Sequence, residues 1–456
     1  TYVSNTYSLH HRFLRTRPQR KLKRNADYKL EYDLDERSYD ILEQLEKWRN
    51  LAPTKDYEEI FLLFYQGSST WLGILQKLIE ARLKGVVAKE LSQDFPGDSL
   101  EKLTKVEKFT REIEILTDLL KILETPSEDG DRVELLRILL LYHLADILQL
   151  QSFRGDLNKL TERIKGRITR PFATDKFPKL VIFTSFNQSA KVIIKMLSET
   201  FGSDAVVSHC QGDSVEKNLT KFKNEPQCFL LVCDRTGTTG KSLQFVNGVI
   251  HFDLPLSIQQ LEQRLKRCEH SPSWLLSGLD DPQSLEGAWY QLLNEGFNIF
   301  HRSVVDLALY TDTKLPEIQN LLFQSGSGGI LDIIPTIKQE ICQEELKISE
   351  QNILEEIDVY EPSFWKYFQE LVAYDNQDEV IEKAVEGWIC NVLKFNRKYS
   401  ENLQDVRSYQ LTKRTLIPRQ ELSSFFADSG LPLGVYKRER ANQYPQAHLY
   451  RLGETF

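Results

Sequence analysis

The sequence lacks the features that identify membrane, metal-binding and disulfide-rich proteins. It contains no run of eighteen apolar residues, because the nearest candidate, Ile138 to Leu148, is interrupted by His143 and Asp146, so no membrane-spanning helix is expected. Its six cysteines form no CxxC pair and its eight histidines are dispersed, so we expect no metal site. Scattered cysteines of this kind are typical of reduced thiols in a cytoplasmic protein.

A strong basic excess is absent as well. The formal net charge of −8 argues against a protein that coats nucleic acid with its whole surface, but it is compatible with a local basic site. With 41% apolar and 27% charged residues, the composition is that of a soluble globular protein. A length of 456 residues is enough for about three structural units.

The most informative stretch runs from Phe229 to His270. It opens with the apolar run 229–233, which predicts a strand buried on both faces, and a second apolar strand is expected from Gly248 to Asp253. The turn between them contains Gly240-Lys241-Ser242, which suggests a phosphate-binding P-loop. Such a loop needs a glycine five positions before the Gly-Lys pair, where this chain has Arg235. We therefore reject the P-loop interpretation.

The same stretch resembles motifs V and VI of the second RecA-like domain in superfamily 2 helicases of the SNF2 and RapA type. The match is ordered and has no gap, and it is carried by Gly237, Gly240, Leu243, Gln244, Phe245, Asp253, Leu254, Pro255, Glu262, Gln263, Arg264 and Arg267. Three positions depart from the family pattern. Lys266 stands where the family has glycine, His270 where it has a second arginine, and Thr239 where RapA-type motors often carry glutamate.

The resemblance implies a nucleotide site on the helix that follows the second strand. Arg267 would act as an arginine finger that neutralises charge on the transferred phosphoryl group, with Arg264 as a second catalytic residue. The other implied nucleotide-binding residues are Gly237, Gly240, Gln263, Lys266 and His270. Positions 263, 267 and 270 are spaced by four and three residues, so they are expected on one helix face. His270 is fully charged only when protonated, so catalysis could be weakened; the alternative is a solvated basic helix.

Residues 179–186 resemble motif IV of the same helicases. They predict a buried strand with Thr184 and Ser185 at its carboxyl end, followed by a helix capped by Asn187. The family contacts the nucleic-acid backbone here and at the motif V turn, which implies contacts from Thr184, Ser185, Thr238, Thr239, Ser242 and Gln244. The alternative is that these are ordinary turn residues that satisfy backbone groups.

The expected fold class is α/β, with one RecA-like parallel-sheet lobe of the P-loop NTPase type. A largely α-helical insertion precedes this lobe and an α+β accessory region follows it. The expected boundaries are 1–32 for a basic arm from a missing first lobe, 33–165 for the insertion, 166–310 for the helicase C-terminal domain, 311–361 for a helical connector and 362–456 for the accessory domain. The arm could track phosphates or form an amphipathic helix.

Helical periodicity divides the insertion into four long helices. They are expected at Asp35–Leu51, Ser69–Leu83, Ser99–Leu123 and Val133–Leu150. Ser69 and Ser99 are the expected N-caps. After the lobe, residues 294–303 carry the pattern Asn-Glu-Gly-Phe-x-x-Phe-x-x-Ser. This pattern resembles SNF2-related proteins of bacterial defence and DNA-modification clusters, with DpdE-like helicase subunits of the 7-deazapurine cluster as the nearest suggestion.

Taken together, the resemblance implies the C-terminal half of an ATP-dependent DNA helicase or translocase. The implied cofactors are ATP and Mg²⁺, and the implied partners are DNA, a first RecA-like lobe and other subunits of a phage-defence or DNA-modification system, with no membrane. We identify neither a P-loop nor an Asp-Glu box, so the chain alone should not hydrolyse ATP, and the first lobe would hold most of the Mg²⁺ ligands. Lys266 and His270 favour the alternative, a degenerate scaffold subunit. A nucleotide-sugar transferase explains neither Gln263-Arg264 nor the basic arm.

Overall fold

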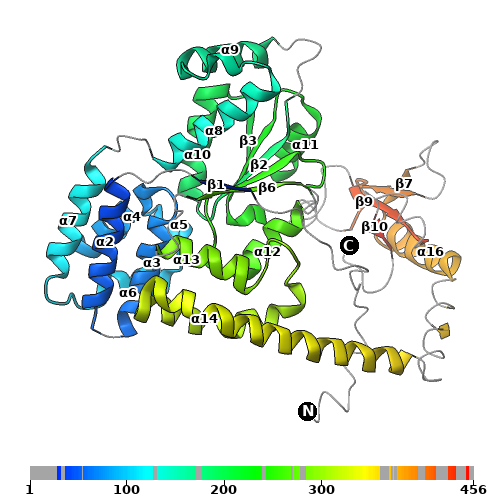
Figure 1. The fold of residues 1–456 in the computed structure, drawn as a ribbon. Helices are drawn as coiled ribbons and strands as arrows, with labels where there is room; N and C mark the ends of the chain where they lie inside the picture. Colours follow the sequence, from blue (N-terminus) through cyan, green and yellow to red (C-terminus); the bar gives the residue numbers. More distant parts are fainter. Residues whose placement is uncertain are drawn as a thin grey trace. The chain divides into compact units, whose positions relative to one another are not determined.

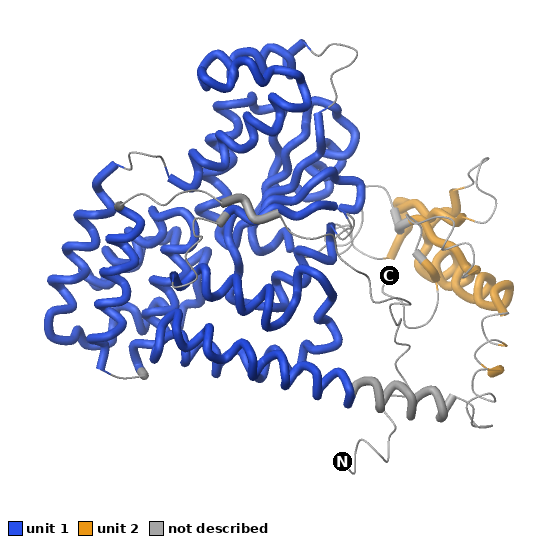
Figure 2. Tube along the Cα trace, viewed as in Figure 1, with its two compact units in different colours: residues 1–347 blue, residues 348–456 orange. Residues whose placement is uncertain are grey.

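The structure is a computed structural model of a two-unit chain. It describes residues 28–31, 36–53, 55–126, 131–170, 177–238, 243–268, 271–277, 284–359, 369–370, 373, 377–398, 406–416, 430–437 and 448–450. The two compact units, coloured separately in Figure 2, are residues 1–347 and residues 348–456.

The first unit is built around a parallel six-stranded sheet. The strands are β1 (Tyr28–Glu31), β2 (Leu180–Phe183), β3 (Val206–His209), β4 (Leu230–Cys233), β5 (Gly248–His251) and β6 (Ser273–Ser277). Their order is β1-β6-β5-β2-β4-β3, and every neighbouring pair is parallel. In β2, β4 and β5 every residue is buried, as a parallel strand covered on both faces requires. The expected α/β fold with a RecA-like parallel sheet is therefore confirmed.

Alternate strand residues point into two hydrophobic clusters, one on each face of the sheet. On one face, Leu180, Ile182 and Ile250 pack in a cluster with helices α8 (Arg132–Ile147), α9 (Leu157–Thr169) and α10 (Asn187–Phe201). On the other face, Val181 and Phe183 pack in a cluster that includes Phe222 of α11 (Val215–Asn224). Figure 1 shows these helices on opposite sides of the strands. Because successive side chains of a strand point to opposite faces of the sheet, each strand contributes residues to both hydrophobic clusters.

Two expected domain boundaries need correction. The helices α8 and α9, assigned to the insertion, bury Leu140, Leu144, Leu160 and Ile164 in the cluster that covers the sheet, so they belong to the lobe. Helical periodicity reports that a helix has one buried face but not whether that face meets a sheet or another helix. The segment assigned to the basic arm also ends in the sheet, because its residues 28–31 form β1 beside β6. The rest of the arm, residues 1–27, lies outside the described residues.

The remaining part of the predicted insertion is a helical subdomain. It consists of α2 (Glu36–Leu51), α3 (Glu58–Ser68), α4 (Leu72–Lys84), α5 (Leu91–Asp94), α6 (Gly97–Lys105) and α7 (Glu112–Glu124), with a short 3-10 helix, η2, at Lys55–Tyr57. Trp48, fully buried, stacks on Phe61 and meets Phe64 edge-on, with ring centroids 6.4 and 5.2 Å away. The helix expected at residues 35–51 is thus present one residue shorter.

The helices expected to start at Ser69 and Ser99 differ from prediction. Ser69 is the C-cap of α3 and Trp71 precedes α4, while α6 starts at Gly97. The single helix expected over 99–123 is two helices. The buried Arg82 donates to the carbonyls of Leu103, Val106 and Glu107 and forms an ion pair with Glu112, so the end of α6 and the start of α7 both bind one guanidinium. No local pattern predicts a cap that comes from another helix.

After the sheet, the chain forms α13 (Leu285–Gln291), a π-helical turn η5 (Leu292–Gly296), a 3-10 turn η6 (Val305–Leu307) and the long α14 (Ala308–Val359). The backbone of α14 is non-helical at Gly326. The hydroxyl of Tyr310 donates to Glu340 at 2.7 Å, and Lys314 forms an ion pair with Glu340 at 3.0 Å. These contacts join residues about thirty positions apart, so α14 is a hairpin of two helical halves that turns at Gly326. Arg49 of α2 donates to the carbonyls of Phe323 and Gln324 just before the turn.

The second unit combines helix and sheet, as expected for an α+β accessory region. Helix α16 (Asp378–Glu386) continues into the π-helical turn η7 (Gly387–Val392). The sheet has the order β10-β9-β8-β7, with β7 at Asn396–Lys398, β8 at Arg407–Gln410, β9 at Gly430–Val435 and β10 at His448–Leu449. Its core holds Ile389, Phe395, Tyr409, Tyr436 and Tyr450.

Two further properties bear on the expectations drawn from composition. All six cysteines are free thiols, with Cys342 exposed, Cys390 half-buried and the others buried. Among the described residues, no helix has both the length and the apolar character needed to span a bilayer.

Candidate functional site

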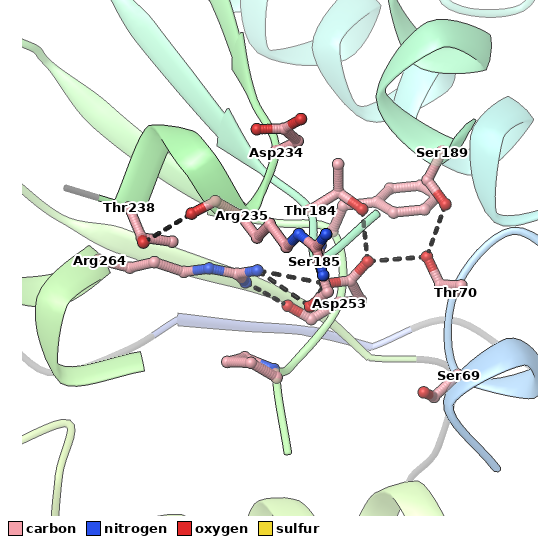
Figure 3. A network of polar contacts seen from close by, with 12 residues as sticks. Ser69, Thr70, Thr184, Ser185, Ser189, Asp234, Arg235, Thr238, Asp253 and Arg264 are labelled. Atoms are coloured by element: carbon pink, nitrogen blue, oxygen red, sulfur yellow. Dashed lines mark hydrogen bonds and ion pairs between the residues drawn. The ribbon is translucent and has the colours of Figure 1, made fainter. Parts of the chain in front are cut away.

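Four of the predicted site residues, Thr184, Ser185, Thr238 and Arg264, lie near the carboxyl ends of β2, β4 and β5, as Figure 3 shows. The centre of the site is Asp253, which is 1% exposed and follows β5. Its carboxylate accepts hydrogen bonds from the Thr184 hydroxyl at 2.5 Å, from the Ser185 amide at 2.8 Å and from the Ser185 hydroxyl at 2.7 Å. It also accepts from the Thr70 hydroxyl, 2.7 Å away, in the loop between α3 and α4. Asp253 therefore ties β2, β5 and the helical subdomain together.

Arg264 lies on the other side of the same carboxylate. It belongs to α12 (Ile258–Arg267), which is capped by the Ser257 hydroxyl. Its guanidinium, 0% exposed, donates to the Asp253 carbonyl at 2.8 Å and to the Ser185 hydroxyl at 3.0 Å, and it lies 3.5 Å from the Asp253 carboxylate. Burial lowers the pKa of Arg264, and the Asp253 charge opposes that shift. Arg264 is thus held by two other segments of the lobe, one after β5 and one after β2.

Arg267, the predicted arginine finger, is the last residue of α12 and is 5% exposed. Its guanidinium donates to the Gly237 carbonyl in the turn after β4 and lies 3.2 Å from Nδ1 of His209 at the end of β3. Burial and the Arg267 charge both lower the pKa of His209, so its imidazole is held neutral and can accept from the guanidinium. Arg267 is at the expected end of the sheet, but its guanidinium is engaged within the lobe. Its role as a finger stays a prediction.

The face expected for Gln263 differs from the structure. Gln263 and Lys266 are exposed, whereas Arg264 and Arg267 are buried against the sheet. The helix packs through Leu261 and Leu265, and residues three apart on that side point inward with them. Helix α12 ends at Arg267, and the expected third member of the face, His270, lies outside the described residues.

The motif V turn begins with a short 3-10 helix, η4 (Arg235–Thr238). Glycine is required at Gly237, because a Cβ there would lie 2.6 Å from the Cβ of Cys233 and 2.8 Å from the His209 carbonyl oxygen. The Thr238 hydroxyl donates to the Arg235 carbonyl at 2.8 Å, and Gln244 is exposed. Of the remaining predicted residues, Thr239, Gly240 and Ser242 lie outside the described residues.

The hydroxyls predicted to contact nucleic acid are mostly committed to partners inside the protein. Thr184 is 0% exposed and Thr238 is 5% exposed, and each donates to an oxygen of the lobe. Ser185 is half-buried and bonds with both Asp253 and Arg264. Of the predicted nucleic-acid residues that the structure describes, Gln244 is therefore the one with an exposed side chain. Roles in nucleic-acid binding stay predictions for all of them.

Sequence analysis missed Asp234, which directly follows β4. Its buried carboxylate accepts from the Thr236 amide and hydroxyl at 2.8 and 2.6 Å, from the Gln211 amide at 3.0 Å and from the Asn187 side chain at 3.1 Å. Burial raises the pKa of Asp234, but these hydrogen bonds together outweigh it and lower the pKa. A polar residue at the carboxyl end of a buried strand was the available signal.

Sequence analysis also missed His251, the last residue of β5. It is 0% exposed and stacks on Phe183, and neither ring nitrogen has a hydrogen-bond partner among the described residues. Burial, assisted by the Arg264 charge, lowers its pKa to about 3, so the ring is neutral at pH 7. Within the described residues, no group of three or more His, Cys, Asp or Glu side chains is arranged to hold a metal ion.

Comparison with known proteins agrees with this geometry. The family model described as the helicase conserved C-terminal domain matches residues 160–270, from the first turn of α9 past the end of α12. The RNA polymerase-associated protein RapA of Haemophilus influenzae (strain PittEE) is 22% identical over 253 residues, which cover 49% of this chain and 27% of the relative. RapA of Photobacterium profundum is 32% identical over 166 residues, or 33% of this chain and 15% of the relative. The chain thus spans about a quarter or less of the length of these curated relatives.

Two solved structures were also similar to this chain. The C-terminal part of the Fun30 ATPase domain aligns with 66% of this chain and 97% of its own length, with a TM-score of 0.33 and 13% identity. The C-terminal domain of the Sulfolobus solfataricus SWI2/SNF2 ATPase aligns with 64% and 95%, with a TM-score of 0.27 and 14% identity. The domain match, the relatives and the parallel sheet show that this chain carries a RecA-like helicase C-terminal lobe, which is similar to that of SNF2/RapA-type superfamily 2 helicases.

Proposed function

We propose that this lobe works as one half of an ATP-dependent DNA translocase, and that a first RecA-like lobe supplies the other half. The proposal rests on one observation above all: two arginines of the motif VI helix, Arg264 and Arg267, lie at the carboxyl edge of a parallel sheet. Ligands of open α/β sheets bind at that edge, and guanidinium groups are suited to phosphate.

In this proposal, ATP binds between the two lobes, and Mg²⁺ is held mainly by the absent lobe. The P-loop and the acidic box would come from that lobe, so this chain alone would not hydrolyse ATP. ATP supplies the phosphoryl group and the energy for stepping. Arg264 would hold the site in shape through its ion pair with Asp253. When the lobes close, the Arg267 guanidinium would donate to a phosphate oxygen in place of the Gly237 carbonyl. Gln263, Lys266 and His270 would assist, as would the turn that contains Gly237 and Gly240.

DNA would contact the lobe at the ends of β2 and β4 and at the exposed Gln244. Thr184, Ser185, Thr238, Thr239 and Ser242 would contribute through the shape of these turns. The protein would act in the cytoplasm, and its partners would include other subunits of a phage-defence or DNA-modification system, in line with the pattern at residues 294–303.

The experiment joins this chain to its upstream lobe and measures ATP hydrolysis with and without duplex DNA. Arg267→Ala should lower the DNA-stimulated rate by about 10³-fold or more, and Arg267→Lys should restore only part of it, because lysine cannot copy the planar fork. Lys217→Ala is the control, since it removes one cation from an exposed position on α11 that has no predicted role in nucleotide or DNA binding. An Arg267→Ala protein that folds and hydrolyses ATP at the wild-type rate would remove Arg267 from the reaction.

A second candidate function is a non-catalytic scaffold that binds DNA or protein. It is favoured by the internal hydrogen bonds of Arg267 and by Lys266 in the place of the family glycine. In that case the Arg267–Gly237 contact is structural, and the complete protein has no DNA-stimulated ATPase activity. A reading frame that encodes neither a P-loop nor an Asp-Glu box upstream of this chain would support the scaffold.

A further inference from the structure

A short segment of the helical subdomain lies across the amino-terminal end of α10. It runs from Gly85, which ends α4 in a left-handed conformation with a φ of +70°, to Pro96, which precedes α6. We call residues 85–96, with the four-residue helix α5 inside them, the α5 strap. Leu91 and Phe95 of the strap are buried, and Phe95 packs on Phe186 with ring centroids 5.1 Å apart.

The strap places a carboxylate on the end of α10. Asp94, 4% exposed, accepts hydrogen bonds from the Asn187 amide at 2.6 Å, the Gln188 amide at 3.2 Å and the Gln188 side chain at 3.1 Å. The expected cap, Asn187, is instead the first residue of α10, after Phe186, and its side-chain oxygen has no hydrogen-bond partner among the described residues. The first amides of a helix carry a partial positive charge and bind anions, so Asp94 fills a position that suits any anionic oxygen.

Three cationic side chains surround this carboxylate. Arg235 donates to the carbonyls of Asp94 and Gln93 at 3.0 and 2.7 Å, Lys77 donates to the Gln188 side chain at 2.7 Å, and Lys191 donates to the Gln93 side chain at 3.2 Å. All of these acceptors are neutral oxygens. Among the described residues, none of the three cations forms an ion pair with a carboxylate.

Three cations therefore face two carboxylates at this end of α10, Asp94 and the buried Asp234 that accepts from the Asn187 side chain, which leaves an excess of one positive charge. The cations come from α4, α10 and the turn after β4, so the excess is a property of the assembled fold rather than of one helix. Burial also opposes ionisation of Asp94 and raises its pKa, despite its three hydrogen bonds. A polyanion that binds here could form ion pairs with these cations. The Asp94 carboxylate that it displaces would be hydrated, which favours its charged form.

We propose that the α5 strap is an autoinhibitory contact, in which Asp94 occupies the position on α10 that a phosphate of the DNA backbone takes when the strap moves away. This proposal rests on the proposed function, because it assumes that DNA binds at the end of β2. The strap can move as a unit because Gly85 and Pro96 bound it. Arg235, Lys191 and the α10 amides then change their acceptors from the strap to phosphate oxygens.

The test measures binding of this chain to a short fluorescent DNA duplex by anisotropy at several salt concentrations. Asp94→Asn keeps the shape of the strap but removes its charge, so DNA affinity should rise about 5- to 30-fold. The slope of the logarithm of affinity against the logarithm of salt should steepen by about one unit, for one more phosphate neutralised. Glu90→Gln, at an exposed position on the same strap, changes the net charge equally and should shift affinity less than about twofold.

Two further measurements keep the proposal testable if Asp94→Asn folds poorly. Phe95→Ala loosens the strap without changing charge and should also tighten DNA binding. Hydrogen exchange of wild-type residues 85–96 should accelerate when DNA is added. DNA binding that is unchanged by both variants, or strap amides that become slower to exchange, would overturn the inference and leave the proposed function standing. If neither the wild type nor any variant binds DNA, the proposed function and the inference are both lost.

Discussion

The charge network around Asp253 can be tested by removing its charge. In the folded lobe the Asp253 carboxylate and the Arg264 guanidinium, 1% and 0% exposed, lie 3.5 Å apart. Asp253→Asn keeps the size of the side chain and one acceptor oxygen, but it leaves Arg264 as a buried cation without its counter-charge. Breaking a buried pair by removing one partner costs about 3–5 kcal/mol. Because Arg264 keeps its bonds to the Asp253 carbonyl and to Ser185, we expect the lower end of that range, about 3 kcal/mol.

The matched control is Asp204→Asn, the same substitution in an ion pair on the surface of the lobe. Asp204 and Lys221 lie 3.4 Å apart with exposures of 79% and 30%, so its loss should cost less than about 1 kcal/mol. A chain of two units does not unfold in a single step, so the readout is the opening free energy of amides in β2 and β5 by native-state hydrogen exchange. A double-mutant cycle with Arg264→Met adds the coupling energy, expected at about 2 kcal/mol. Equal effects of Asp253→Asn and Asp204→Asn would refute the assignment of Asp253 as the centre of the network.

Three other predictions follow from single contacts. His251 has a folded pKa of about 3, below its unfolded value, so its contribution to stability is complete above pH 6.5 and is lost as the pH falls towards 3. His251→Phe should flatten the acid limb of a melting-temperature profile, because it removes a dependence of the free energy of unfolding on pH of up to about 1.4 kcal/mol per pH unit. Gly237→Ala should destabilise the lobe by about 1–3 kcal/mol, whereas Gly166→Ala, with open space around its Cβ in α9, should be neutral or stabilising in the same melts. Ser303→Ala removes the hydroxyl that donates to the buried Glu262 at 2.6 Å and should cost about 1–3 kcal/mol in urea titrations; an unchanged midpoint would contradict this role of the hydroxyl.

The lobe was predictable because its signals are local. Strands β2, β4 and β5 are short apolar runs followed by polar turns, and burial on both faces of a parallel sheet demands such runs. The helix α12 and its arginines were found in the same way, from the order of residues along one stretch. What the pattern could not decide is which side of α12 faces inward. That depends on Asp253 and on the Gly237 carbonyl, which reach the helix from two other segments.

The contacts between the helical subdomain and the lobe could not be predicted at all. Thr70 lies 183 positions from Asp253, and Asp94 lies 93 positions from Asn187. A threonine or an aspartate near a helix end is common, and the neighbouring residues in the sequence do not indicate which distant residue it will contact. The same limit explains why one helix was expected over residues 99–123, since Arg82 of α4 binds the carbonyls at the end of α6.

The place of β1 at the edge of the sheet has a mechanical consequence. Residues 28–31 are joined to β6 in a parallel register from Tyr28 opposite Trp274 to Glu31 opposite Ser277. The residues before Tyr28 are therefore joined directly to a strand that is hydrogen-bonded to β6. Because β6 also pairs with β5, a continuous set of hydrogen-bonded strands joins this edge of the sheet to the strand that precedes Asp253. We expect a force applied before Tyr28 to reach the carboxyl end of the sheet by this route.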